Sequence, residues 1–170
     1  HLHMIQELHD PDVWMHFKTG EYIIQHKTVP QVDIFSSTMS GKEWIENTWL
    51  VRVIYYLMFH YGGSDSLLFL SSILVMLAFL ILFFSVYTER RHLTLIMGIL
   101  FLTVFASTTR FNIRPENFSF LFFSLYIFIL VRHTRKKWLF LLPLIQLIWA
   151  NCHIYFILGP FLLGIFLLSE

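Results

Sequence analysis

The sequence predicts an all-α, polytopic membrane protein with a large loop on the outer face of the membrane. Hydrophobic residues make up 56% of the chain and charged residues only 14%, whereas soluble domains contain about 25% charged residues. The apolar residues are concentrated in residues 66–170, in runs long enough to cross a bilayer. Residues 1–65 are more polar and are expected to form the outer loop. The chain is expected to be a fragment of a longer protein.

Residues 66–170 contain a series of apolar runs separated by polar turns. The run at 67–87 is long enough for a membrane-spanning helix, which needs about 20 residues. Further runs occupy 93–109 and 117–131. The last run, 138–168, is too long for one ordinary span, and we predict two short helices with a break at 151–153. One long kinked helix is the alternative. A break at membrane depth needs polar partners, which predicts an internal cavity there.

The basic turns predict the orientation of these spans. Lys and Arg are clustered at 88–92 and 132–137. Two spans separate the clusters, so both lie on the same side of the membrane, and that side is expected to be cytoplasmic. Residues 1–65, the turn at 110–116 and the break at 151–153 are therefore expected on the outer side.

Two amphipathic helices are expected in the outer loop, both lying at the membrane interface. Asp10 is a suitable N-cap for the first, with Pro11 as its first helical residue, and the sequence at 28–30 ends it. The second is expected at 42–61, with the glycine pair at 62–63 as its C-terminal signal. Tryptophans in this region are suited to interfacial anchoring.

The first candidate site is the acidic pair Asp10 and Asp12. A carboxylate at a membrane surface can act as a general base toward a hydroxyl group, or can hold a divalent cation. Simple capping of the first helix is the alternative, and the two interpretations are compatible. His9 and His16 lie near the pair, but their spacing is not that of a specific metal site. Whether a metal binds stays open, and His16 is a candidate substrate contact.

The second candidate site is the outer turn that contains Arg110, Arg114 and Glu116. Arginine presents a planar fork of donors that suits phosphate, and it keeps its charge at all ordinary pH values. The two arginines are therefore candidate ligands of a lipid phosphate. Snorkelling to ordinary lipid headgroups is the alternative. Glu116 is a candidate substrate contact.

Asn151 and His153 form the third candidate site, because polar side chains inside an apolar run are costly and mark functional positions. A polar hinge that satisfies the broken backbone is the alternative, and we favour it.

Glu43 and Glu46 stand one helical turn apart in the second loop helix and are interpreted as a solvated face. The single cysteine, Cys152, excludes an internal disulfide and a cysteine-cluster metal site. A net charge of +1 offers no electrostatic basis for nucleic-acid binding.

Several stretches of the chain resemble a family of bacterial multi-span membrane proteins. Residues 10–21 read D-P-D-V-W-M-H-F-K-T-G-E, and residues 29–36 read V-P-Q-V-D-I-F-S. The family pattern is roughly D-P-D-x-W-W-H-x-x-T-G, then P-x-x-D-x-F-S and a later W-L. Residues 114–119 (R-P-E-N-F-S) and 149–153 (W-A-N-C-H) are similar to its R-P-x-x-F-S and W-A-N-x-H. This family is similar to the GT-C superfamily of glycosyltransferases.

The resemblance implies a helical membrane fold that uses a polyprenyl-phosphate-linked sugar on the outer face of a bacterial plasma membrane. It places Asp10 and Asp12 where the superfamily has its first-loop acidic motif, which supplies a catalytic base or holds a cation. Arg110 or Arg114 is assigned to the donor phosphate by chemistry rather than by a motif. The chain departs from the pattern at Met15, where the family often has a second Trp.

The predicted function is transfer of a sugar from a polyprenyl phosphate to a hydroxyl acceptor. Its partners would be the lipid-linked sugar and membrane lipids. The first alternative is a non-catalytic membrane scaffold or lipid-binding subunit, and the second is a transporter fragment. The enzyme predicts a polar cavity that joins the acidic pair to the arginine turn, whereas the scaffold predicts that no cavity reaches the pair.

Overall fold

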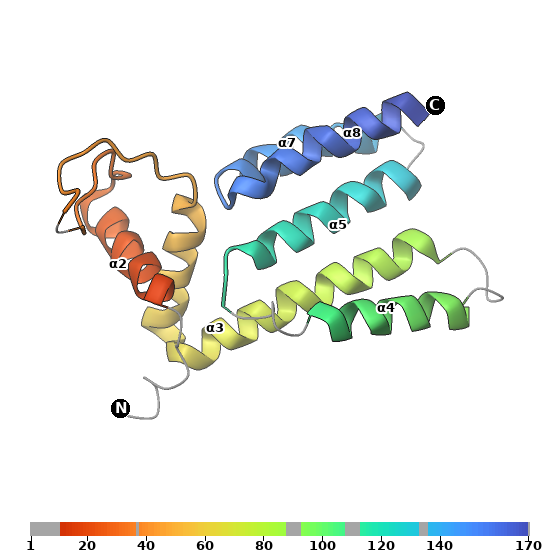
Figure 1. Cartoon of the computed structure of the whole chain (residues 1–170), viewed down its shortest axis with the longest axis horizontal. Coiled ribbons are helices and arrows are strands. Elements are labelled where there is room, and N and C mark those ends of the chain that lie inside the picture. Colours follow the sequence, from red (N-terminus) through yellow and green to blue (C-terminus); the bar gives the residue numbers. More distant parts are fainter. Residues whose placement is uncertain (1–10, 37, 88–92, 108–112, 133–135, 170) are drawn as a thin grey trace.

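The computed structural model describes residues 11–36, 38–87, 93–107, 113–132 and 136–169 (Figure 1). Within these residues the regular elements are helices, residues 27–48 form a loop, and the β-structure is a single bridge between Val32 and Glu43. The all-α prediction is therefore confirmed. The helices are α2 (Pro11–His26), α3 (Trp49–Val86), α4 (Leu93–Ser107), α5 (Glu116–Arg132), α6 (Lys136–Leu139), α7 (Leu141–Ala150), the 3-10 helix η3 (Ile154–Ile157) and α8 (Leu158–Ser169).

Helix α3 joins the two parts of the molecule and bends sharply at Gly63 (Figure 1). Gly63 has φ 66° and ψ −161°, a backbone conformation that glycine adopts without a Cβ penalty. The Ser66 hydroxyl lies 2.6 Å from the carbonyl oxygen of Met58 and 2.7 Å from that of Gly63, so its proton can satisfy either freed acceptor. The predicted helix end at Gly62 and Gly63 is thus confirmed: α3 consists of two helical parts that meet at a kink at Gly63.

The first part of α3 begins at Trp49 rather than at residue 42, so the predicted start of the second loop helix was wrong. Residues 42–44 instead pair with residues 31–33: the Asp33 amide donates to the Lys42 carbonyl at 2.8 Å, and the Trp44 amide donates to the Gln31 carbonyl at 2.8 Å. These pairings hold residues 42–44 in an extended conformation that cannot join a helix.

Helix α5 lies between the second part of α3 and the pair α7 and α8 (Figure 1). Helix α4 lies within the apolar run predicted at 93–109, and α5 covers the run predicted at 117–131 and one further residue at each end. The last run forms α7 and α8, and the chain between them turns at 151–153. The predicted break is confirmed. Trp149 and Tyr126 are buried at the centre of the α5–α7–α8 packing.

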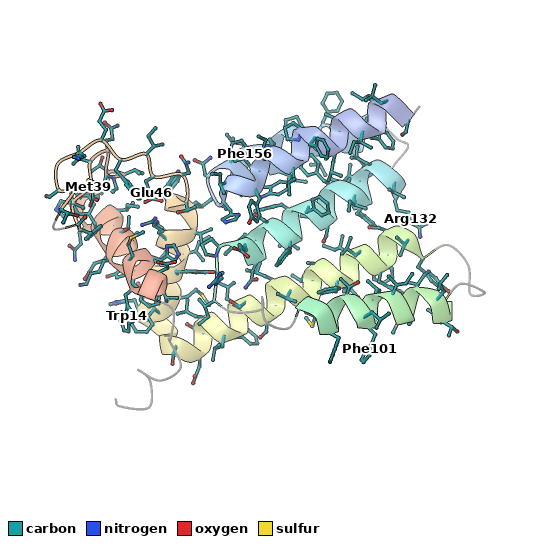
Figure 2. All side chains as sticks on the ribbon, in the orientation of Figure 1. Trp14, Met39, Glu46, Phe101, Arg132 and Phe156 are labelled. Carbon is teal, nitrogen blue, oxygen red and sulfur yellow. The ribbon has the colours of Figure 1, made fainter. Side chains whose placement is uncertain are left out.

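One described helix, α3, is long and apolar enough to cross a membrane, as judged from its length and composition. Shorter apolar helices cover Leu93–Phe105, Leu141–Ala150 and Ile154–Ser169. Many large apolar side chains on these helices are exposed, and Phe101 on α4 points away from the other helices in Figure 2. Extensive exposed apolar surface is typical of proteins that contact lipid.

Candidate functional site

A polar cleft of about 260 Å³ lies where three helices begin. Asp12 is in the first turn of α2, Thr48 immediately precedes α3, and Glu116 opens α5. His153, in the break after α7, also lines the cleft. The complete lining is Asp12, His16, Thr48, Arg52, Ile113, Arg114, Pro115, Glu116 and His153.

Helix α2 brings Asp12 and His16 to the cleft because residues four apart lie on the same face of a helix. Pro11, the first described residue, is already helical, and the predicted N-cap Asp10 lies outside the described residues. On the neighbouring face, Val13 and Phe17 are buried against α3 in the main apolar cluster. The apolar face of α2 thus packs on α3 and holds the polar face in the cleft.

Arg52 is the central buried cation of the site and was not singled out from the sequence. It is 5% exposed, and its Nε lies 2.9 Å from Glu46 Oε1 and 3.1 Å from Thr48 Oγ1. Its Nη1 donates to Thr19 Oγ1 at 2.8 Å. A charged residue within the apolar sequence W-L-V-R-V-I is the signal that could have identified it, because such a charge requires polar partners.

Glu46 is the counter-ion of Arg52, which corrects the interpretation of Glu43 and Glu46 as a solvated pair. Glu43 is exposed, but Glu46 is only 8% exposed. The Glu46 carboxylate also accepts hydrogen bonds from the Thr48 hydroxyl at 2.7 Å and from the Trp44 indole at 3.1 Å. The two acids differ because residues 42–48 do not form the expected helix.

The two candidate residues in the break after α7, Asn151 and His153, make different contacts. Asn151 Oδ1 accepts from Trp49 Nε1 at 2.6 Å, and the Asn151 carbonyl accepts from the Leu50 amide at 3.1 Å. These bonds attach the break to the start of α3, and Asn151 is not among the residues that line the cleft. His153 does line it, with Nδ1 2.9 Å from Ser119 Oγ.

Burial lowers the pKa of His153, and the nearby Glu116 carboxylate partly opposes this effect by favouring the charged imidazolium. A histidine with a lowered pKa is neutral at physiological pH. The carboxylate and guanidinium groups that line the cleft belong to Asp12, Glu116, Arg52 and Arg114.

The structure brings together Asp12, His16, Arg114, Glu116 and His153, which the sequence had identified in three separate segments. Asp10 and Arg110 lie outside the described residues. Among the residues that the structure does describe, no group of three or more His, Cys, Asp and Glu side chains is placed to hold a metal ion.

A second, more apolar pocket of about 380 Å³ adjoins the cleft, and Arg52 lines both. Its walls include Trp14, Phe35 and Trp44, with Glu46 beside Arg52. Figure 2 shows Glu46 near the start of α3 and Trp14 on α2. The site therefore offers a charged cleft and an aromatic pocket that share Arg52 as a lining residue.

Comparison of the chain with protein-family models, with curated proteins and with solved structures found no match.

Proposed function

We propose that this chain is part of a polytopic membrane glycosyltransferase that moves a sugar from a polyprenyl phosphate to a hydroxyl acceptor on the outer face of the membrane. The observation that carries the proposal is the shared cleft of Asp12, Arg114 and Glu116. A carboxylate, a guanidinium group and a neutral histidine meet there beside a long apolar helix.

Asp12 is the proposed general base. As the acceptor oxygen bonds to the anomeric carbon of the sugar, the bond from that carbon to the phosphate oxygen breaks, and the acceptor proton passes to the Asp12 carboxylate. Negative charge develops on the departing lipid phosphate. Arg114 is placed to stabilise that charge, and Arg52 adds a second guanidinium group to the same cleft.

The ends of the helices add to this electrostatic arrangement. The N-termini of α2, α3 and α5 adjoin the cleft through Asp12, Thr48 and Glu116. The first turn of a helix carries partial positive charge, which favours a bound anion. Together with the arginines, these termini favour a phosphate group over an uncharged lipid headgroup.

The proposed location is a bacterial plasma membrane, with residues 1–65 on its outer face. The basic turns at 88–92 and 132–137 support this orientation. The exposed apolar side chains of α4, α7 and α8 support contact with lipid. In this arrangement the cleft lies at the outer end of the helices, where a lipid-linked sugar presents its phosphate.

Radiolabelled sugar transfer in membranes that contain the full-length protein tests the proposal. A panel of polyprenyl-phosphate sugars is supplied to the native protein and to Asp12→Asn, with expression matched. Loss of the base is expected to reduce transfer by about 10²- to 10⁴-fold. Asp65→Asn is the control, because Asp65 is an exposed carboxylate on α3 that does not line the cleft.

Equal transfer by the native and Asp12→Asn proteins would remove Asp12 from the mechanism. No transfer with any donor, combined with equal binding of polyprenyl phosphate by both proteins, would instead support a non-catalytic lipid-binding subunit.

A further inference from the structure

We propose that Trp149 and Ser119 hold His153 as a neutral imidazole with its hydrogen on Nε2, so that this N–H donates to a phosphate oxygen bound in the cleft. Ser119 and Trp149 are positioning residues, because they act through His153 and do not line the cleft themselves. The identity of the ligand as a lipid phosphate rests on the proposed function, whereas the state of the imidazole does not.

The direction of each hydrogen bond follows from the donor chemistry of the three side chains. Trp149 Nε1 lies 2.9 Å from Ser119 Oγ, and an indole N–H can only donate. Ser119 Oγ therefore accepts this bond and has its own proton to donate. The partner that remains for that proton is His153 Nδ1, at 2.9 Å.

The opposite tautomer would leave a buried donor without a partner. If Nδ1 carried the hydrogen and donated to Ser119, the serine hydroxyl would accept two bonds and its proton would have no acceptor. Ser119 is 3% exposed and Trp149 is fully buried, so water would not compensate. An unsatisfied buried donor costs about 1–3 kcal/mol. The arrangement thus selects the Nε2–H form.

The chain geometry makes this contact rigid. The His153 amide donates to the Trp149 carbonyl at 3.1 Å, which ties the two residues together across the end of α7. Both side chains then reach the same hydroxyl on α5. The W-A-N-C-H segment ends at His153 and the R-P-E-N-F-S segment ends at Ser119, and the two segments lie far apart in the sequence. In the structure both contribute to positioning the His153 ring.

The surroundings of the ring favour its neutral state and define its ligand. Burial lowers the pKa of His153, and the Glu116 carboxylate opposes this only in part. With Nδ1 engaged by Ser119, Nε2 is the ring nitrogen available to the cleft. An N–H donor beside Arg114 suits an oxygen of a phosphate group. The titratable and charged groups around the ring are Asp12, His16, Arg52, Arg114, Glu116 and Tyr155.

Nitrogen NMR of the full-length protein in nanodiscs, with ¹⁵N-labelled histidine, measures the state of the ring directly. The His153 signals are assigned by their loss in His153→Gln. The expected result is the Nε2–H tautomer in the native protein, with a pKa below the ordinary value of about 6.5, and a mixture of tautomers in Ser119→Ala. An Nδ1–H tautomer in the native protein, or an unchanged tautomer in Ser119→Ala, would overturn the proposal.

Ligand binding to the same nanodiscs tests the role of the N–H group. The probes are a polyprenyl monophosphate, the corresponding prenyl alcohol and inorganic phosphate. His153→Phe is expected to weaken binding of the monophosphate about tenfold, the loss of one charge-assisted hydrogen bond, while His153→Gln, which keeps an N–H donor, restores most of it. Equal affinity of the native and folded His153→Phe proteins for every phosphate probe would contradict the donor role. Preference for the lipid over inorganic phosphate identifies the source of the phosphate.

These measurements do not depend on catalysis. The tautomer is observed without a sugar donor, so a protein that fails the transfer assay can still confirm or overturn the Trp149–Ser119–His153 arrangement. Conversely, a confirmed tautomer would not by itself establish transfer.

Discussion

The Glu46–Arg52 ion pair is buried beside the aromatic pocket, and its Arg52 member also lines the charged cleft. Both side chains are nearly inaccessible to solvent, and removing charged groups from water is costly unless they are paired and hydrogen-bonded. Thr48 bonds to both members of the pair, and Thr19 adds a bond from α2 to Arg52. The pair therefore connects the loop, α2 and α3 at one buried point.

Replacement of Glu46 by glutamine is expected to lower the free energy of unfolding by about 3 kcal/mol, because Arg52 would be left buried without its counter-ion. Chemical denaturation in detergent, monitored by tryptophan fluorescence, measures the change. Glu43→Gln is the matched control, since Glu43 is exposed, and it is expected to change stability by no more than about 0.5 kcal/mol. Similar losses in the two variants would show that Arg52 does not depend on Glu46.

The chemistry of single residues singled out three side chains that the structure brings to one cleft: Asp12 as a carboxylate, Arg114 as a phosphate ligand and His153 as a polar group inside an apolar run. The environment of other residues depends on pairing and was not predicted. Glu46 was misplaced because a helical period was assumed for residues 42–48, which are extended or turned in the structure. Ser119 carried no local signal that linked it to His153, and the two are separated by 34 positions in the chain.

The contact between α2 and α3 is close enough to require glycine at position 20. A Cβ at Gly20 would lie 2.2 Å from the Arg52 carbonyl oxygen and 2.7 Å from Tyr56 Cβ. Since the carbonyl belongs to the backbone of α3, a larger residue would push the two helices apart. The close approach of the two helices fixes the positions of Asp12 and His16 relative to Arg52. It also explains why the segment K-T-G-E has a glycine at position 20.

Gly20→Ala is expected to lower the free energy of unfolding by about 1–3 kcal/mol, the usual cost of overpacking. Gly98→Ala is the matched control on α4, where an added Cβ meets nothing within 4 Å. It is expected to leave stability unchanged or to raise it by up to about 1 kcal/mol, because alanine favours helix over glycine. Thermal unfolding by circular dichroism compares the two. A stable Gly20→Ala protein would mean that the helices approach less closely.

Helix boundaries were predictable where a proline or a glycine interrupts the backbone hydrogen bonds of the helix. The predicted helix after Asp10 is present as α2, which covers Pro11–His26 of the described residues. The glycine at position 63 likewise ends the first helical part of α3, as expected, and a second helical part follows across the kink. The Ser66 hydroxyl bonds to the carbonyl oxygens of Met58 and Gly63 at this kink.

The proposed orientation of the molecule in the membrane is testable by cysteine labelling. In a Cys152→Ser background, Thr38→Cys in the loop is expected to react with an impermeant maleimide in intact cells. Lys137→Cys, in the basic cluster at 132–137, is expected to react only after the membrane is permeabilised. Cys152 is itself buried, so its removal serves to exclude background labelling. The reverse pattern would place the cleft on the cytoplasmic side and contradict a donor used on the outer face.

Composition and periodicity sufficed to predict a helical chain, its apolar runs and the break at 151–153, because these depend on neighbouring residues and on local backbone preferences. The assembly of the site depends on packing between segments that are far apart in sequence. Trp49 meets Asn151 across 102 positions, and Arg52 meets Thr19 across 33. Local patterns contain no record of such pairs, since the partners become neighbours only when α2 and α5 pack on the two parts of a bent α3.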